Sequence, residues 1–281
     1  MPFFRVFFKT LGILFGITTF LIVINIMLFF FQNNNNFQFV EGDTNSKNLI
    51  AIINLNGPIL NNFNQYLINN LLDYIQPEKI KKDLENLENL KPKIVIFKIN
   101  SPGGTVNGTA NLEKIIKNFK KSNDIKIYFY TNEILASGGY WVATTGDKIY
   151  AQYGAILGSI GVSGPSWYYY DQPISISTGI FGNKIETKNE IEIYDQNAGN
   201  FKDLYNPFRK PTTKELNHLK NMVNEIYNDF VLKVSQSRKI EISTLKNDIG
   251  ALIFTSNQAK NNFLLDDVIE FDELINNIVK E

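Results

Sequence analysis

Residues 93–130, KIVIFKINSPGGTVNGTANLEKIIKNFKKSNDIKIYFY, contain two apolar runs separated by an amphipathic stretch. The runs KIVIFKI (93–99) and KIYFY (126–130) are short and rich in Ile, Val, Phe and Tyr, which is typical of strands buried on both faces. The stretch between them follows a Gly-Gly turn and has helical periodicity over residues 106–121. A strand, a helix and a second strand in this order predict a parallel sheet covered by helices.

The same alternation continues on both sides of this stretch. The run NLIAIINLNGPI (48–59) is a candidate buried strand that ends at a Gly-Pro turn, and a charged helical stretch follows over residues 65–90. Further along we expect a helix at 137–145, a strand KIYA at 148–151 and one long amphipathic helix at 212–238. We therefore predict an α/β fold of repeated β-α units around a parallel sheet.

An apolar segment near the N-terminus predicts a membrane anchor. Residues 10–31, TLGILFGITTFLIVINIMLFFF, contain no charge, and a helix needs about 20 apolar residues to cross a bilayer. The segment is longer than the apolar core of a cleaved signal peptide, and no small-residue cleavage site follows it. Because Arg5 and Lys9 precede the segment and acidic residues follow, the positive-inside rule places the N-terminus in the cytoplasm.

The chain then divides into four parts. We expect a cytoplasmic N-terminus at residues 1–9, a transmembrane signal anchor at 10–31, a polar linker at 32–47 and a folded domain at 48–281. With this topology the anchor lies in the cytoplasmic (inner) membrane. The folded domain is expected on its outer side, which is periplasmic or extracellular.

Composition excludes several classes of function. Lys plus Arg and Asp plus Glu both number 28, so the chain has no net field that would attract nucleic acid. The absence of cysteine excludes disulfides, thiolate metal sites and a cysteine nucleophile. The single histidine, His218, excludes multi-histidine metal sites. We expect no metal, no cofactor and no nucleic-acid partner.

Two glycine-rich turns follow neighbouring predicted strands. One is SPGG at residues 101–104, and the other is ASGG at 136–139, in which Ser137 precedes two glycines. The carboxyl ends of parallel strands meet at one edge of a sheet, where α/β proteins form their sites. Backbone N–H groups at such turns can stabilise a developing negative charge. These residues alone leave Ser137 either as a nucleophile or as a small residue at a tight packing point.

A serine nucleophile requires a base that accepts its proton. His218 lies on the predicted helix at 212–238 among polar residues and away from the apolar stripe, so we interpret it as a surface residue. A lysine can serve when burial or nearby positive charge lowers its pKa. Periodicity alone selects none of the lysines for this role.

Several blocks of sequence resemble a known family in the same order. They are IAIINLNGPI, INSPGG, ASGGYWVATTGDKIYA, GAILGSIGV, GNFKDLYNPFRKPT and GALIFTSNQAKNNFLLDDV, and they cover most of residues 48–270. Together they resemble the signal peptide peptidases of the SppA type, which are serine proteases with a Ser-Lys dyad on a ClpP/crotonase-like fold. The resemblance implies that fold here, and it implies assembly into a homo-oligomeric ring.

The resemblance also implies roles for individual residues. Ser137 is the expected nucleophile, Lys202 in NFKD is the expected general base, and Ser159 in LGSIGV is expected to orient that lysine. The oxyanion hole would be formed by the backbone N–H groups of Gly103, Gly104 and Gly138. We interpret Asp203 and Arg209 as structural charges.

One stretch departs from the family pattern. Lys202 follows Ser137 by 65 positions, more than in short members of the family, and the extra residues lie around 178–196. A surface hairpin would absorb them, because loop insertions cost little free energy. Lys184 and Lys188 lie in this stretch and are alternative bases.

We therefore expect a membrane-anchored serine endopeptidase that cleaves hydrophobic peptides, such as remnant signal peptides, through an acyl-enzyme. Two alternatives are a non-catalytic protease-like scaffold that binds membrane proteins or peptides, and a crotonase-type acyl-thioester enzyme, which would not need the serine-lysine pair. The aromatic run SWYYY (166–170) is expected to line a peptide groove, face the bilayer or simply pack.

Overall fold

The computed structural model describes residues 2–31, 37–43, 46–61, 73–170, 177–179, 182–184 and 198–280. For residues 2, 26–31, 177–179 and 182–184 it describes the backbone alone. The chain divides into two compact units, Met1–Lys47 and Asn48–Glu281.

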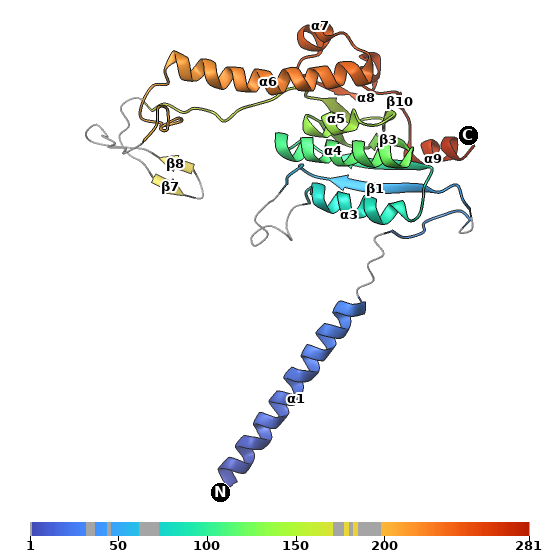
Figure 1. The fold of residues 1–281 in the computed structure, drawn as a ribbon, viewed down its shortest axis with the longest axis vertical. Coiled ribbons are helices and arrows are strands. Elements are labelled where there is room, and N and C mark those ends of the chain that lie inside the picture. The colour runs from blue at the N-terminus through green and yellow to red at the C-terminus, as the bar shows by residue number, and fades with distance from the viewer. Residues whose placement is uncertain are drawn as a thin grey trace. The chain divides into compact units, whose positions relative to one another are not determined.

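The first unit contains one long helix, α1 (Pro2–Phe31) (Figure 1). Its stretch Phe3–Asn25 has a mean hydropathy of 2.1 and none of it is buried, so this helix is long and apolar enough to cross a membrane. The amide of Asn25 donates to the carbonyl of Leu21 within the same helix, which reduces the cost of a polar side chain in lipid. The expected span at residues 10–31 lies within α1.

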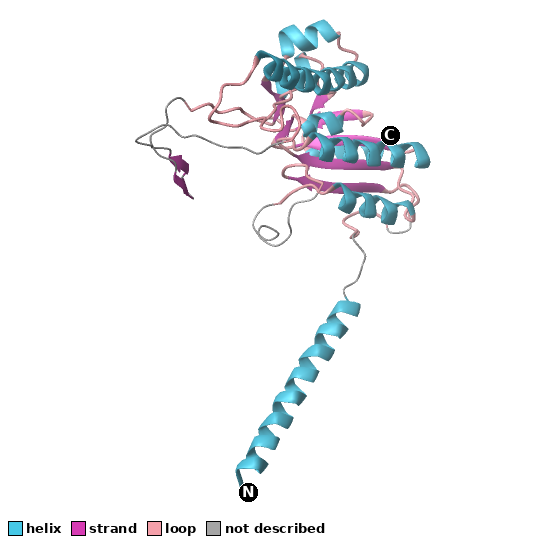
Figure 2. Cartoon of the chain, turned by 60° about the vertical axis from the view of Figure 1, so that its left-hand side comes forward, coloured by secondary structure: helices cyan, strands magenta, loops and turns pink. Residues whose placement is uncertain are grey.

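The second unit is built on a parallel sheet, which confirms the predicted α/β class (Figure 2). The strand order is β1-β2-β3-β5-β10, and each neighbouring pair is parallel. The four strands expected from apolar runs are present. The five strands are β1 (Ile50–Asn56), β2 (Ile94–Asn100), β3 (Lys126–Thr131), β5 (Lys148–Ala151) and β10 (Asp267–Val268).

Helices cover the apolar side chains of this sheet. Leu274 of α9 (Phe271–Lys280) packs with Ile96, Tyr128 and Tyr130, so α9 covers one face of the central strands. Phe97 of β2 and Phe129 of β3 are next to these residues along their strands, so their side chains point to the other face of the sheet. Their rings stack there with centres 5.1 Å apart. The remaining helices next to the sheet are α3 (Pro77–Glu88) and α4 (Val106–Asn123), which contact each other.

A second, smaller sheet carries the serine turn. Its strands are β4 (Ile134–Ala136), β6 (Ile156–Gly158) and β9 (Ile253–Thr255), with β4 and β6 parallel and β6 and β9 antiparallel. The short helix α5 (Gly138–Ala143) follows β4 directly. Sequence patterns did not predict β4, because three residues are too few to establish a period.

The C-terminal part contains the long helix expected at 212–238, present as α6 (Thr213–Arg238). After it come α7 (Ile242–Thr244), the π-helical turn η1 (Leu245–Ile249) and α8 (Ser256–Asn261).

The expected insertion contains a two-stranded antiparallel pair, β7 (Ser177–Gly179) and β8 (Gly182–Lys184). The Lys184 side chain and Lys188 lie outside the described residues, so neither is placed against the site.

Candidate active site

Two serines emerge side by side from paired strands. Ala136 of β4 lies opposite Gly158 of β6, and the next residues are Ser137 and Ser159. The backbone N–H of Ser137 donates to the carbonyl of Gly158 at 2.9 Å. Both serines are half-buried and both have a positive φ, 52° and 51°. The structure thus brings together Ser137 and Ser159, which come from separate sequence blocks.

Ser137 occupies a strained turn between a strand and a helix. Its φ of 52° and ψ of −123° are uncommon for a residue with a side chain. It precedes the first turn of α5, in which the N–H of Trp141 donates to the Ser137 carbonyl at 2.9 Å. A sharp strand-to-helix turn of this kind exposes the nucleophilic serine of other hydrolases.

Two glycines allow the chain to pack closely around this serine. A Cβ on Gly103, whose φ is 112°, would lie 2.7 Å from the Ser137 Cβ and 3.0 Å from its Oγ. A Cβ on Gly138 would lie 2.4 Å from Thr109 Oγ1, a buried hydroxyl with no partner among the described residues. Side chains at either position would therefore displace the serine turn.

The backbone donors near the serine differ in availability. The N–H of Gly103 donates to Ser101 Oγ at 3.2 Å, so it is engaged and its contribution is the absence of a side chain. Gly138 is the first residue of α5, where helix geometry provides no acceptor for the N–H. Gly104 lies opposite Ile59, but the hydrogen bonds of this bridge involve the Gly103 carbonyl and the Thr105 N–H. The N–H of Gly104 itself has no acceptor among the described residues. Gly104 and Gly138 thus remain as candidate oxyanion donors.

Lys202 lies in a series of turns that precedes α6. Its side chain is exposed, and its N–H donates to the carbonyl of Gly199 at 3.3 Å. Phe201 and Tyr205, on either side, both have a φ of 67°. Such backbone angles in residues with large side chains show that the surrounding structure constrains this turn.

The long helix α6 connects the surroundings of the two expected dyad residues. Near one end, Phe230 stacks at 5.1 Å on Trp141, one helical turn from Ser137. Near the other end, Glu215 belongs to the ion-pair network that holds the residue after Lys202. Glu215 and Phe230 are 15 positions apart (230 − 215), which corresponds to about 22 Å along a helix. Among the described residues, no hydrogen bond or ion pair joins Lys202 to Ser137 or Ser159.

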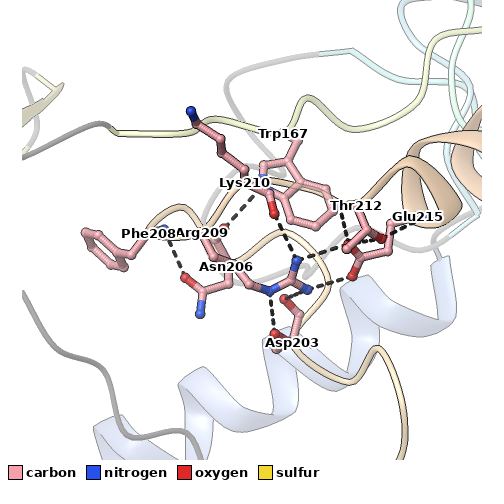
Figure 3. Close-up of polar contacts among 8 residues, drawn as sticks. All are labelled: Trp167, Asp203, Asn206, Phe208, Arg209, Lys210, Thr212 and Glu215. Atoms are coloured by element: carbon pink, nitrogen blue, oxygen red, sulfur yellow. Dashed lines mark hydrogen bonds and ion pairs between the residues drawn. The ribbon is translucent and has the colours of Figure 1, made fainter.

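The turn that carries Lys202 is held by a network around Arg209 (Figure 3). Arg209 Nε donates to Asp203 Oδ2 at 2.5 Å, and its Nη2 donates to Glu215 Oε1 at 2.6 Å. The guanidinium lies over the Trp167 ring, 5.2 Å from its centre. The Arg209 guanidinium lowers the pKa of the Glu215 carboxyl to about 2, and it also holds the pKa of Asp203 below its usual value.

Sequence reasoning missed the role of Glu215 and Trp167 in this network. The Thr212-x-x-Glu215 spacing is a capping-box signature, and the structure contains that box at the start of α6. The spacing was therefore a usable signal for Glu215. The position of Trp167 depends on tertiary contacts that no local pattern reports.

A buried carboxylate fixes the serine helix to its neighbours. Glu113 of α4 is 5% exposed and accepts from the Trp141 indole at 2.7 Å, from Lys117 at 2.6 Å and from Lys233 at 2.9 Å. Burial raises the pKa of Glu113, but these hydrogen bonds outweigh burial and leave the pKa below its usual value. Glu113 therefore joins α4, α5 and α6 beside the serine turn.

His218 is exposed on α6, as expected. Among the described residues no group of three or more His, Cys, Asp or Glu side chains is arranged to hold a metal ion.

Comparison with known proteins gives consistent matches. The model of Peptidase family S49 matches residues 119–281. "Putative protease MJ0651" of Methanocaldococcus jannaschii is 31% identical over 186 residues, which cover 66% of this chain and 54% of that protein. "Putative signal peptide peptidase SppA" of Enterococcus faecium is 28% identical over 246 residues, which cover 86% of this chain and 65% of that protein. This chain thus matches only part of the length of these curated relatives.

Among solved structures, the 1510-N membrane-bound stomatin-specific protease matches with a TM-score of 0.47 and 15% identity. The match covers 82% of this chain and 84% of that chain.

Proposed function

Because the chain belongs to peptidase family S49, we propose that it is a membrane-anchored serine endopeptidase with Ser137 as its nucleophile. The observation that carries this proposal is the strained turn at Ser137, with a φ of 52°. Its hydroxyl lies against Gly103, the Gly138 N–H belongs to the same turn, and the Gly104 N lies 3.3 Å from where a Cβ on Gly138 would be. This arrangement offers a nucleophile and two donors for the charge that develops during acyl transfer.

The proposed reaction forms and breaks an acyl-enzyme. Ser137 Oγ attacks the peptide carbonyl carbon, while its proton passes to the neutral amine of Lys202. The carbonyl oxygen becomes an oxyanion that accepts hydrogen bonds from the N–H groups of Gly104 and Gly138. Lys202 then gives the proton to the leaving amine, and the C–N bond breaks to leave an ester on Ser137. Water, deprotonated by the same lysine, hydrolyses the ester.

Ser159 is proposed to orient the lysine. It emerges beside Ser137 from the paired strand and is half-buried, so its hydroxyl can accept or donate without adding charge. A hydroxyl partner holds an amine in place while leaving it neutral, as a general base requires.

We propose that the lysine reaches Ser137 from a second copy of the chain. Two observations support this arrangement: the Lys202 side chain is exposed, and no hydrogen bond or ion pair joins it to Ser137 or Ser159 among the described residues. Each site would then need two copies. A closed ring satisfies this requirement at every position, since each copy donates a serine to one site and a lysine to the next.

Hydrophobic peptides, including remnant signal peptides, are the proposed substrates. Two exposed apolar side chains lie beside the site, Leu252 (60% exposed) and Ile253 (54%). The Leu252 carbonyl accepts from the N–H of Ser159 at 2.8 Å, so this apolar surface adjoins the serine that follows β6. The name of the Enterococcus faecium relative, "Putative signal peptide peptidase SppA", supports the same class of substrate.

The apolar helix α1 supports attachment to the cytoplasmic membrane. Arg5 and Lys9 near its N-terminus favour a cytoplasmic location for that end, so the catalytic domain would work on the outer side. There it would meet peptides that remain in the membrane after translocation.

Labelling with a fluorophosphonate tests the proposed activity. The full-length protein in detergent micelles should form a covalent adduct, and Ser137→Ala should abolish it because the attacking oxygen is gone. Ser122→Ala removes an exposed hydroxyl on α4 and serves as the matched control, with labelling unchanged. Circular dichroism verifies that each variant is folded. Absence of labelling in folded wild-type protein would favour the non-catalytic scaffold and contradict the proposal.

A further inference from the structure

All five N–H donors of Arg209 are occupied. Nε donates to Asp203 Oδ2, Nη1 to Glu215 Oε2 and the Lys210 carbonyl, and Nη2 to Glu215 Oε1 and the Asp203 carbonyl, at 2.5–3.4 Å. A guanidinium has five N–H groups, so none is left unused. In Figure 3 the guanidinium lies between Asp203 and Glu215, next to the Trp167 ring.

The two carboxylates of this network differ in burial. Glu215 is fixed, because its side chain is 2% exposed and it also accepts from the N–H and hydroxyl of Thr212 in the capping box of α6. Asp203 is bound through both its carboxylate and its main-chain carbonyl. Arg209 thus ties the backbone next to Lys202 to the buried start of a long helix.

We propose that Arg209 is a positioning residue for the lysine base. It fixes the turn that carries Lys202 and keeps the Asp203 carboxylate paired away from the Lys202 amine. This inference rests on the proposed function, in which Lys202 accepts the proton of Ser137.

The electrostatic part follows from the position of Asp203. An anion next to an ammonium favours the charged form, and a charged lysine cannot accept a proton. No carboxylate contacts the Lys202 amine among the described residues. The other charged or titratable side chains near this turn are Lys210 over Tyr169, Lys214 over Phe201, His218 on α6, and Tyr168 and Tyr170 in the Trp167 segment.

The test is the rate at which a fluorophosphonate phosphonylates Ser137, with loss of fluoride, as a function of pH, measured on the full-length protein in micelles. Arg209→Gln frees Asp203, so the rate should fall about 10- to 100-fold and the midpoint of its rise with pH should move up by about one unit. Arg209→Gln combined with Asp203→Asn removes the freed carboxylate charge, so the midpoint should return to its wild-type value. The rate should stay low, because Arg209 no longer fixes the turn. Arg209→Lys keeps the positive charge but loses the planar guanidinium that binds both carboxylates. It should therefore lower the rate about tenfold and leave the midpoint of the pH profile at its wild-type value.

Arg238→Gln is the matched control. Arg238 donates to Asp266 at 2.8 Å near the other end of α6, so its loss should lower stability and leave the midpoint unchanged. Should Arg209→Gln not fold, Asp203→Ala retains the Arg209–Glu215 pair and should lower the rate about tenfold.

The outcomes separate this inference from the proposed function. If wild-type protein is not phosphonylated at Ser137, the function fails. If wild type is phosphonylated but Arg209→Gln keeps its rate, or loses rate with no shift of the midpoint, Arg209 is not a positioning residue and the inference is overturned.

Discussion

Gly103 shows how closely the backbone packs against the candidate nucleophile. Its φ of 112° is accessible to glycine, and a Cβ there would overlap Ser137 at 2.7 Å. Since the Gly103 N–H is engaged by Ser101, the residue acts by leaving room for the serine hydroxyl.

Gly103→Ala should therefore remove activity. We expect acylation of Ser137 to fall about 100-fold or more, because the displaced hydroxyl no longer faces the oxyanion donors. Unfolding free energy should fall by about 1–3 kcal/mol from the strained φ and the overlap.

Gly154→Ala provides the control for this substitution. Gly154 has a φ of 90° with no atom within 4 Å of an added Cβ, so it carries the strain without the clash. It should lose stability but retain acylation. Equal loss of acylation in both variants would contradict a local role for Gly103.

Residue-level sequence reasoning reached part of this site. The serine before two glycines marked a turn but left two roles open for Ser137, and the family resemblance then implied that it is the nucleophile. The engagement of the Gly103 N–H was not visible, since it depends on where Ser101 points. The packing of α6 on α5 was also hidden, because the contact between Phe230 and Trp141 joins distant parts of the chain.

At the scale of elements, the orientation of α5 depends on Glu113. This carboxylate connects α4 to the Trp141 indole and to Lys233 of α6. The serine turn, Trp141 and the start of the helix form one short unit, so a shift of Trp141 would also move Ser137.

Glu113→Gln should lower unfolding free energy by about 1–3 kcal/mol at neutral pH, because two lysines would lose their anionic partner at a buried position. Since the folded-state pKa of Glu113 lies below its usual value of 4.5, its contribution is present above that pH and is lost as pH falls through the folded-state pKa. The difference between wild type and variant in urea unfolding should therefore shrink in acid.

The exposed pair Lys81–Glu85 supplies the comparison for Glu113. Its atoms are 3.9 Å apart and both side chains are more than half exposed. Glu85→Gln should change stability by less than about 0.5 kcal/mol. A similar small effect for Glu113→Gln would contradict the proposed role of the buried carboxylate.

The elements themselves were predicted where a period was long enough. Helix α6 followed from apolar residues at helical spacing over many turns, and β2 and β3 followed from apolar runs. The strand β4 and the π-helical turn η1 are too short or too irregular for such patterns, and their conformations follow from the contacts around them.

At the scale of the whole molecule, the account requires more than one copy of the chain. The Lys202 side chain is exposed and has no bond to Ser137 among the described residues, so we expect a complete dyad only between copies. The sequence left this open, because assembly is not encoded in any local pattern.

Mixing two inactive variants tests shared sites. Ser137→Ala and Lys202→Ala proteins should each be inactive yet folded. In co-expressed mixed particles with random order, about one quarter of the sites should pair an intact serine with an intact lysine of the neighbour. Fluorogenic peptide hydrolysis should therefore return to about a quarter of the wild-type rate. If particles shown to contain both variants recover no activity, then either the serine and the lysine of each site come from the same chain or Lys202 is not the base.

The most direct measurement is the distance between Lys202 Nζ and Ser137 Oγ in an experimental structure of the assembled protein. The account predicts a separation within hydrogen-bond reach, about 2.6–3.2 Å, between two neighbouring copies, with Ser159 beside the amine. An intact assembly in which no copy of Lys202 approaches any Ser137 would contradict it.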